Sequence, residues 1–246
     1  MIAFIVPYRD RKQQQLFFDK QMTTEVMKNY TYGTDYIIMY IHQKDNRLFN
    51  RGALKNIGYL VIKELYPETY KTITLVFNDV DVMPFTADFL NYETKPGIVK
   101  HFYGYVHTLG GIVSIMPEDF EKINGFPNFW TWGYEDTILH DRVKANYIKI
   151  ERSQFYPMYN KNILLLMHDF DRIMSHKENH KITNGTTEGL SQIDNLEYTI
   201  DNETKMINVT NFNTGSPEPK DTFVQDARKE FYIPGPPVKL KFTRKK

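Results

Sequence analysis

The first third of the chain alternates short apolar runs with amphipathic stretches. The apolar runs lie at residues 1–7, 35–42 and 72–77. Continuous apolar runs of this length, bounded by polar loops, are typical of strands buried on both faces of a parallel sheet. Residues 12–30 and 54–65 have the apolar spacing of helices that bury one face. This alternation predicts an α/β domain with a Rossmann-like, mostly parallel sheet that carries its ligand at the carboxyl ends of the strands.

The second half of the chain has a less regular pattern. Strands are predicted within residues 98–117, and a short helix that begins with a proline is predicted at residues 117–123. A further helix is predicted at residues 135–146, and two short apolar segments predict a hairpin at residues 196–209. The predicted fold is therefore a Rossmann-like half followed by an irregular half and a C-terminal hairpin.

The end of the chain differs in composition from the rest. Residues 215–246 contain five prolines and finish in a basic run. We expect an extended or loosely docked tail, because proline cannot donate to a sheet and interrupts helices. The predicted organisation is one domain at residues 1–216 and a tail at residues 217–246.

Polar residues gather where each of the three predicted parallel strands ends. These clusters lie at residues 8–11, 43–51 and 79–81. The last cluster is Asp79-Val80-Asp81, in which one carboxylate can bind a divalent ion while the other contacts a ribose hydroxyl or supports the site. Aspartate is also common at strand ends for structural reasons, so the triplet alone leaves both readings open.

An aromatic loop holds the second candidate cluster. Residues 129–136 contain both tryptophans of the protein and end in Glu135-Asp136. Tryptophan can stack on a sugar ring, and a carboxylate beside apolar groups becomes a better general base because its pKa rises. The alternative is a helix start, where acidic residues stabilise the helix dipole.

One histidine is placed where it could bind a metal. His168 follows the apolar run at residues 163–167, and a histidine at a strand end can complete a metal site together with Asp81. A lone histidine is also common as a hydrogen-bonded core or surface residue, and that alternative stays open.

Composition narrows the class of protein. The formal net charge is +1 and there is no cysteine, so the chain lacks the strongly basic character of nucleic-acid binders, and any metal must use Asp, Glu or His. We expect no membrane span, because every apolar run is far shorter than the ~20 residues that a span requires. No phosphate-binding motif of the P-loop type occurs.

Six segments in matching order resemble the animal β-1,4-galactosyltransferase family. The resemblance extends from residue 2 to about residue 216. The segments are residues 6–11, 49–59, 77–84, 110–111, 123–128 and 130–136.

The resemblance implies a GT-A fold, an irregular half that binds the acceptor, a Mn²⁺ cofactor and inverting transfer of galactose from UDP-galactose to a sugar or glycoconjugate hydroxyl. It implies that Asp136 is the general base and that Glu135 supports the donor sugar. It also implies that Asp81 and His168 are the metal ligands. The residues implied to bind the donor are Pro7, Arg9, Arg11, Phe49, Arg51, Asp79, Gly111 and Trp132.

The chain departs from the family pattern in four respects. The acidic run after Asp136 is cut short by Thr137 and Ile138, which leaves the acceptor open. The positions just before His168 offer only Leu165, Leu166 and Met167, so fewer protein groups would hold the ion.

The other two departures concern the donor and the location. Thr108 stands where the family often has a tyrosine that restricts the donor's 2-substituent. The family's membrane anchor and disulfides are missing, so we expect a cytoplasmic protein, in the host cytoplasm if the source is viral. Alternative functions are transfer of N-acetylgalactosamine or another hexose from its UDP-sugar, or sugar binding without catalysis. Joint retention of the residues assigned to catalysis and to the metal favours an active enzyme.

Overall fold

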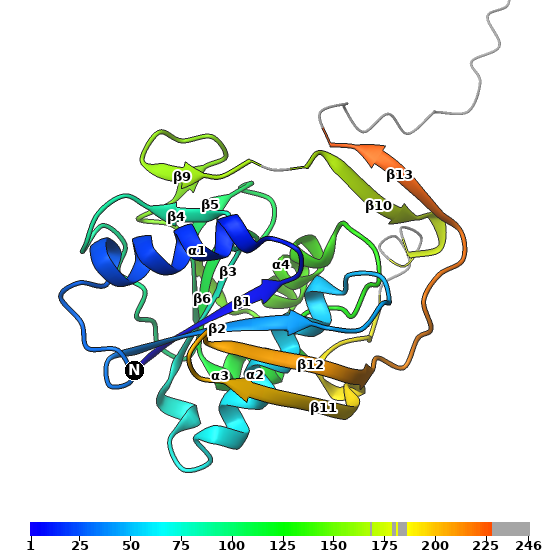
Figure 1. Ribbon diagram of the computed structural model, residues 1–246, viewed down its shortest axis with the longest axis horizontal. Helices are drawn as coiled ribbons and strands as arrows, with labels where there is room; N and C mark the ends of the chain where they lie inside the picture. The colour runs from blue at the N-terminus through cyan, green and yellow to red at the C-terminus, as the bar shows by residue number, and fades with distance from the viewer. Residues whose placement is uncertain (168, 179–180, 182–185, 228–246) are drawn as a thin grey trace, which may run out of the picture.

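The central sheet is built around the predicted apolar strands. The computed structural model describes residues 1–167, 169–178, 181 and 186–227. Its main sheet has nine strands in the order β11-β12-β2-β1-β3-β6-β5-β7, with β8 paired to β5 (Figure 1). The bounds are β11 Asp194–Asp201, β12 Met206–Asn213, β2 Tyr36–Gln43, β1 Ile2–Tyr8, β3 Thr74–Asn78, β6 Ile112–Ile115, β5 Ile98–Gly104, β7 Lys149–Glu151 and β8 Tyr156–Pro157.

Strand directions confirm the predicted Rossmann-like half. β1 runs parallel to both β2 and β3, and β12 runs parallel to β2. The predicted hairpin is formed by β11 and β12, which pair antiparallel, and it extends this same sheet instead of standing apart. β6 pairs antiparallel with β3, so the regular parallel pattern stops where the irregular half begins.

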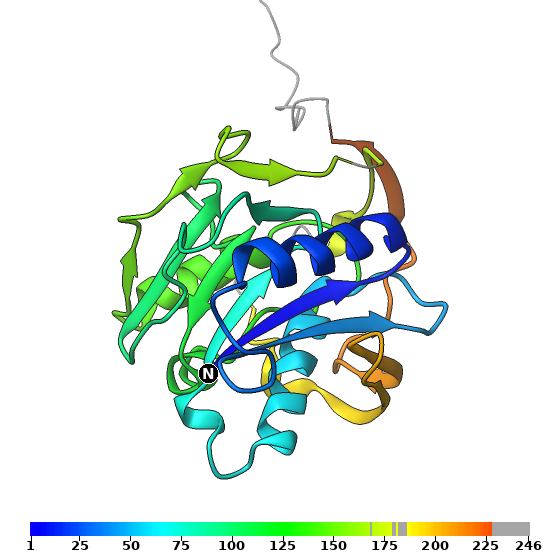
Figure 2. The same cartoon turned by 60° about the vertical axis from the view of Figure 1, so that its left-hand side comes forward.

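The helices cover both faces of the sheet, as Figures 1 and 2 show for α1 and α2. Alternate residues of β1 point to opposite faces. Phe4 belongs to the core cluster beneath α1, whereas Ile5 belongs to the cluster beneath α2. Gly58 lets α2 approach the sheet closely, because a Cβ there would lie 2.3 Å from Ile5 Cγ2. The helices are α1 Lys12–Gln21, α2 Arg51–Leu65, α3 Pro117–Lys122 and α4 Glu135–Ala145.

The beginning of α2 is earlier than the apolar pattern predicts. The helix begins at Arg51 because the Asn50 side chain caps it, accepting a hydrogen bond from the Ala53 N–H at 2.9 Å. A Cβ at Gly52 would lie 2.0 Å from the Pro127 carbonyl oxygen, so the first turn packs directly on the loop before the aromatic segment. The first turn of α2 is therefore held against this loop.

Shorter elements complete the fold. The helix predicted at residues 12–30 ends at Val26, after a π-helical turn that directly continues α1. In the described part of the chain, no helix is long and apolar enough to span a bilayer. Further short elements are the π-helical turn Met22–Val26, the 3₁₀ turns Tyr70–Thr72 and Leu190–Gln192, and the strand pair β4 Val82–Pro84 and β9 Ile163–Leu165.

The described part of the tail includes an extended strand that docks on the domain, which agrees with the first of the two expected alternatives. β13 (Thr222–Asp226) pairs antiparallel with β10 (Asp171–Ser175) (Figure 1). Upstream of β13, the Leu48 N–H donates to the Glu218 carboxylate at 2.5 Å. The boundary at residue 216 stays a prediction, and residues 228–246 lie outside the described residues.

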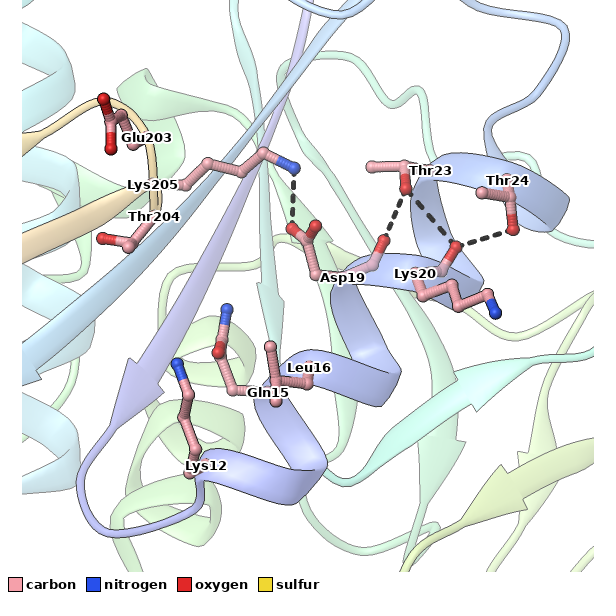
Figure 3. Close-up of a pocket in the computed structure, with 10 residues that line it drawn as sticks. All are labelled: Lys12, Gln15, Leu16, Asp19, Lys20, Thr23, Thr24, Glu203, Thr204 and Lys205. Carbon is pink, nitrogen blue, oxygen red and sulfur yellow. Dashed lines mark hydrogen bonds and ion pairs between the residues drawn. The ribbon is translucent and has the colours of Figure 1, made fainter.

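A surface hollow of about 380 Å³ lies between α1 and the turn that joins β11 to β12 (Figure 3). An ion pair of 2.7 Å between Asp19 Oδ1 and Lys205 Nζ crosses it and ties the helix to the hairpin. None of the predicted site residues lines this hollow.

Candidate active site

The Asp-Val-Asp turn follows β3 at the carboxyl edge of the sheet. Asn78, the last residue of β3, fixes the turn by donating to the carbonyl oxygens of Asp79 and Val82, both at 2.8 Å. The Asp79 N–H donates to the Gly111 carbonyl at 3.0 Å, which ties the turn to the glycine pair. The predicted location of the two aspartates is confirmed, and their backbone is held from two sides.

Arg51 is at the centre of the site. Its Nη2 lies 2.7 Å and 2.8 Å from the two carboxylate oxygens of Asp79. Its Nη1 lies 2.8 Å from Glu135 Oε1, and Nη2 is also 3.2 Å from Asp136 Oδ2. One guanidinium thus gathers carboxylates from the turn after β3 and from the first turn of α4, two segments far apart in the sequence.

Lys55 is a site residue that sequence reasoning missed. It lies one helical turn after Arg51, and its Nζ is 3.0 Å from Asp136 Oδ1. The side chain is only 2% exposed. The available signal was the spacing of four residues, which places both cations on one face of a helix, but nothing local to α2 indicated which carboxylate they would meet.

The glycine pair allows Asp136 to lie against the backbone. A Cβ at Gly110 would be 2.4 Å from Asp136 Oδ2, so any larger residue would displace the carboxylate. Gly111 has φ of 71° and its carbonyl accepts from Asp79, as described above. The Leu109 N–H donates to the Asp136 carbonyl at 2.9 Å. The backbone of the two glycines therefore contacts the Asp79 turn through Gly111 and the Asp136 carboxylate through Gly110.

The pKa of the predicted base Asp136 is lowered, not raised as its apolar surroundings suggested, so the carboxylate is ionised at neutral pH. Burial raises the pKa of Asp136, but the charges of Arg51 and Lys55 outweigh burial and hold the pKa below its ordinary value. Burial dominates at Glu135 and raises its pKa, although Arg51 opposes this. Two adjacent carboxyls thus have pKa values displaced in opposite directions, an arrangement typical of acid–base sites.

Asp81 has the environment of a group that binds a cation. Burial, and then the neighbouring Asp79 carboxylate, raise the pKa of Asp81 to about 6 against the opposing charge of Arg51. An oxygen donor in an uncompensated negative environment suits a hard divalent ion. The described residues contain no group of three or more Asp, Glu or His side chains that could hold a metal, and His168 lies outside the described residues.

Residues after β1 and β2 form the predicted donor side of the site. The Arg9 guanidinium lies 5.1 Å from the centroid of the Phe49 ring and donates to the Arg47 carbonyl at 2.6 Å. Pro7 is buried in β1, while Arg11 is half-buried and its charge reaches Asp81. The Arg9 guanidinium and the Phe49 ring thus provide a cation and a flat apolar group next to each other.

The two tryptophans have different positions. Trp130 is buried in the core, stacked on Phe212 at 5.4 Å, and its indole N–H donates to the Ser216 carbonyl at 2.9 Å. Trp132 is 37% exposed, and its backbone N–H donates to the Ile173 carbonyl of β10 at 2.8 Å. Trp132 is therefore the tryptophan that can contact a ligand, whereas Trp130 is structural.

His101 supports the glycine pair from beneath. Its Nε2 lies 3.0 Å from the Tyr103 carbonyl and 3.1 Å from the Gly110 carbonyl, and its Nδ1 is 3.1 Å from Arg152 Nε. Burial, with the charge of Arg152 next, lowers the pKa of His101 to about 4. The ring is therefore neutral and donates through Nε2 while Nδ1 accepts from Arg152.

We expect His101→Gln to flatten the acid dependence of stability. The unfolded histidine titrates near pH 6.5 and the folded one near pH 4, so its contribution to stability is complete above pH 6.5 and falls as the pH drops to 4. The full effect is roughly 3 kcal/mol. Urea unfolding at several pH values measures it. Glutamine can still donate to the two carbonyls. As a control, the substitution of the exposed His107 by Gln should keep the wild-type slope of unfolding free energy against pH. Equal slopes for the wild type and both variants would contradict this role of His101.

Sequence comparisons match most of the chain to one family. Residues 1–94 match the N-terminal region of glycosyl transferase group 7, and residues 99–168 match the N-terminal domain of galactosyltransferase. Human β-1,4-galactosyltransferase 4 is 32% identical over 164 residues, which cover 61% of this chain and 44% of that protein. Drosophila melanogaster β-1,4-galactosyltransferase 7 is 29% identical over 163 residues, covering 62% and 48% respectively. The chain spans about half the length of these relatives.

Solved structures share the fold. The catalytic domain of Drosophila β-1,4-galactosyltransferase 7 in complex with xylobiose superimposes with a TM-score of 0.65 and 22% identity, over 85% of this chain and 93% of that one. A mutant of the same enzyme, in complex with manganese, UDP-Gal and xylobiose, matches equally well. The fold and the carboxylate-rich edge of the sheet place this protein in the GT-A class. Within that class, the chain belongs to the β-1,4-galactosyltransferase family.

Proposed function

We propose that this protein transfers galactose from UDP-galactose to a hydroxyl group of a sugar acceptor in one inverting displacement. The observation that carries the proposal is the assembly around Arg51, which holds Asp79, Glu135 and Asp136 within 3.2 Å of one guanidinium. Membership of the β-1,4-galactosyltransferase family supports it, and so does the similarity to an enzyme solved with UDP-Gal.

The donor side of the site fits a UDP-sugar. Arg9 and Phe49 offer a cation and a ring for the uridine end, and Arg51 is in place for the diphosphate. Asp81 would hold Mn²⁺, and the bound ion would neutralise the charge that develops on the leaving UDP. The raised pKa of Asp81 is consistent with this role, because burial and then the neighbouring Asp79 carboxylate disfavour its charged form when no cation is bound.

The acceptor side supplies a base. As the acceptor oxygen forms its bond to the anomeric carbon, the bond from that carbon to the UDP phosphate oxygen breaks, and the hydroxyl proton passes to Asp136. The charges of Arg51 and Lys55 keep Asp136 ionised before this step. Glu135, buried and bonded to Arg51, would support the donor sugar.

A donor screen tests the proposed function. Purified protein is incubated with Mn²⁺, a panel of simple sugar acceptors and each of several UDP-sugars, and the release of UDP is measured. We expect acceptor-dependent UDP release that is highest with UDP-galactose or UDP-N-acetylgalactosamine. Binding of UDP-sugar without any release would instead favour a sugar-binding module without catalysis.

Donor choice gives a sharper prediction. Thr108 is half-buried, and the backbone N–H of the next residue, Leu109, donates to the Asp136 carbonyl. The Thr108 hydroxyl donates to the Tyr105 carbonyl at 3.2 Å. Because threonine is smaller than the family's tyrosine and leaves more room for the N-acetyl group, UDP-N-acetylgalactosamine should be used at a rate comparable to that of UDP-galactose.

The substitution Thr108→Tyr should then favour galactose by on the order of 10-fold or more. Ratios of kcat/KM for the two donors measure the preference, and Thr94→Tyr, at a half-buried threonine outside the site, serves as control. A strict galactose preference in the unmodified protein would assign the filter to another residue.

The acceptor and the location belong to the same proposal. A carbohydrate or glycoconjugate supplies the hydroxyl, and its identity is open because Thr137 and Ile138 replace the family's acidic run.

We propose a cytoplasmic location, which fractionation of the source cell would test.

A further inference from the structure

Lys55 is buried in a way that is costly for lysine. Its side chain is 2% exposed and its Nζ lies 4.3 Å from the centroid of the Phe126 ring. Lysine is almost never fully buried unless it is paired, because removing its charge from water costs several kcal/mol. The residue therefore depends on a partner, and that partner is the Asp136 carboxylate at 3.0 Å.

The two cations near Asp136 are not equivalent. Arg51 divides its donors among three carboxylates, and its contact to Asp136 Oδ2 is the longest of them at 3.2 Å. Lys55 pairs, among the described residues, with Asp136 alone. Oδ1 is thus fixed by Lys55, whereas Oδ2 lies against Gly110 and has, within the part of the chain that the structure describes, only the long contact to Arg51.

We propose that Lys55 is a positioning residue that holds Asp136 by Oδ1 and leaves Oδ2 to receive the proton of the acceptor hydroxyl. This inference rests on the proposed function, in which Asp136 is the base. The ring of Phe126 fixes the ammonium group from one side, and the rigid second turn of α2 carries it to the carboxylate.

The pairing has a consequence for pH dependence. Among the described residues, the charged and titratable groups near Asp136 are Arg51 and Lys55 from α2, His101 from β5, the adjacent Glu135, and Asp79, which shares Arg51 Nη2 with it. His101 is neutral over the working range because its pKa is about 4. An opposite charge within hydrogen-bond distance typically lowers a carboxyl pKa by about 1–3 units, so loss of Lys55 should raise the pKa of Asp136 by that amount.

The test compares two lysines of the same helix. Lys55→Met keeps the length of the side chain and removes its charge, while Lys63→Met removes an exposed lysine that pairs with Glu121 at 2.7 Å. We expect the apparent pKa on the acid side of the pH profile of kcat/KM to rise by about 1–3 units in Lys55→Met. In Lys63→Met this apparent pKa should stay unchanged. A loss of activity by the same factor at every pH would show a purely structural role and overturn the proposal.

A second measurement keeps the proposal separate from the proposed function. The Asp136 carboxyl is titrated by NMR in the ligand-free protein, where Lys55→Met should show the same upward shift. If the wild type transfers no sugar, the proposed function fails, yet this titration still reports whether Lys55 controls Asp136. An unchanged titration overturns the inference. If Lys55→Met does not fold, Lys55→Arg is measured instead. It retains the positive charge and should keep the wild-type apparent pKa on the acid side of the kcat/KM profile. A changed apparent pKa in Lys55→Arg would also contradict the proposed role of Lys55.

Discussion

Asp136→Asn should lower kcat by about 10²–10⁴-fold, the range that general-base catalysis contributes. Asparagine keeps the shape of the side chain, and its carbonyl can still accept from Lys55 Nζ, which lies 3.0 Å from Oδ1 in the wild type. The substitution removes the basicity together with the negative charge that pairs with Lys55, but it leaves the donor side of the site in place, so UDP-sugar affinity should be nearly unchanged. Turnover is measured by UDP release and donor affinity by calorimetry.

Glu135→Gln is the matched comparison, because Glu135 shares Arg51 with Asp136 but lies deeper, at 4% exposure. It should weaken the productive handling of the donor sugar and affect donor binding as well as turnover. If Asp136→Asn retains near-normal kcat, Asp136 is not the base, and Glu135 becomes the first residue to test in that role.

Loss of the metal should have a comparable effect. Removal of divalent ions with a chelator, or the substitution Asp81→Ala, should reduce turnover by on the order of 10²–10³-fold or more, because a bound ion supplies several kcal/mol of charge stabilisation. Activity should return on addition of Mn²⁺ to the chelated wild type, and much less in the variant. The Asp81 side chain is half-buried and lies near Asp79.

Binding of the ion can be measured apart from turnover. Electron paramagnetic resonance of free Mn²⁺, titrated with protein in the presence of UDP, should show bound ion in the wild type and much weaker binding in Asp81→Ala. Asp88→Asn is the control: Asp88 accepts from Asn29 Nδ2 at 2.8 Å, and asparagine tolerates its φ of 55°. Full activity in excess chelator would remove the metal from the proposal.

Motifs in the sequence identified the two carboxylate segments of the candidate site, but not the contacts between them. The two halves of the predicted site, Asp79 and the Glu135-Asp136 pair, were identified from sequence. That one arginine joins them was not, because each carboxylate segment was predicted from its own neighbours. The same limit explains Trp130, which shares a loop with Trp132 but turns into the core to meet Phe212.

The tail shows what composition leaves undecided. Its prolines indicated an extended or loosely docked segment, and residues 222–226, which contain no proline, form the extended strand β13 paired with β10. Edge pairing needs only a short proline-free stretch and an available partner strand, and the partner cannot be identified from the tail's own sequence.

The sequence by itself determined the elements whose signal is local. Buried parallel strands appear as continuous apolar runs, and α2 appears as a helical period, because side-chain direction repeats with the backbone geometry of each element. Only the tertiary structure decided that β12 lies parallel to β2, and that Lys55 is buried against Asp136. Both depend on residues more than 80 positions apart, and the burial of a charge is decided by its distant partner, which the pattern around it does not contain.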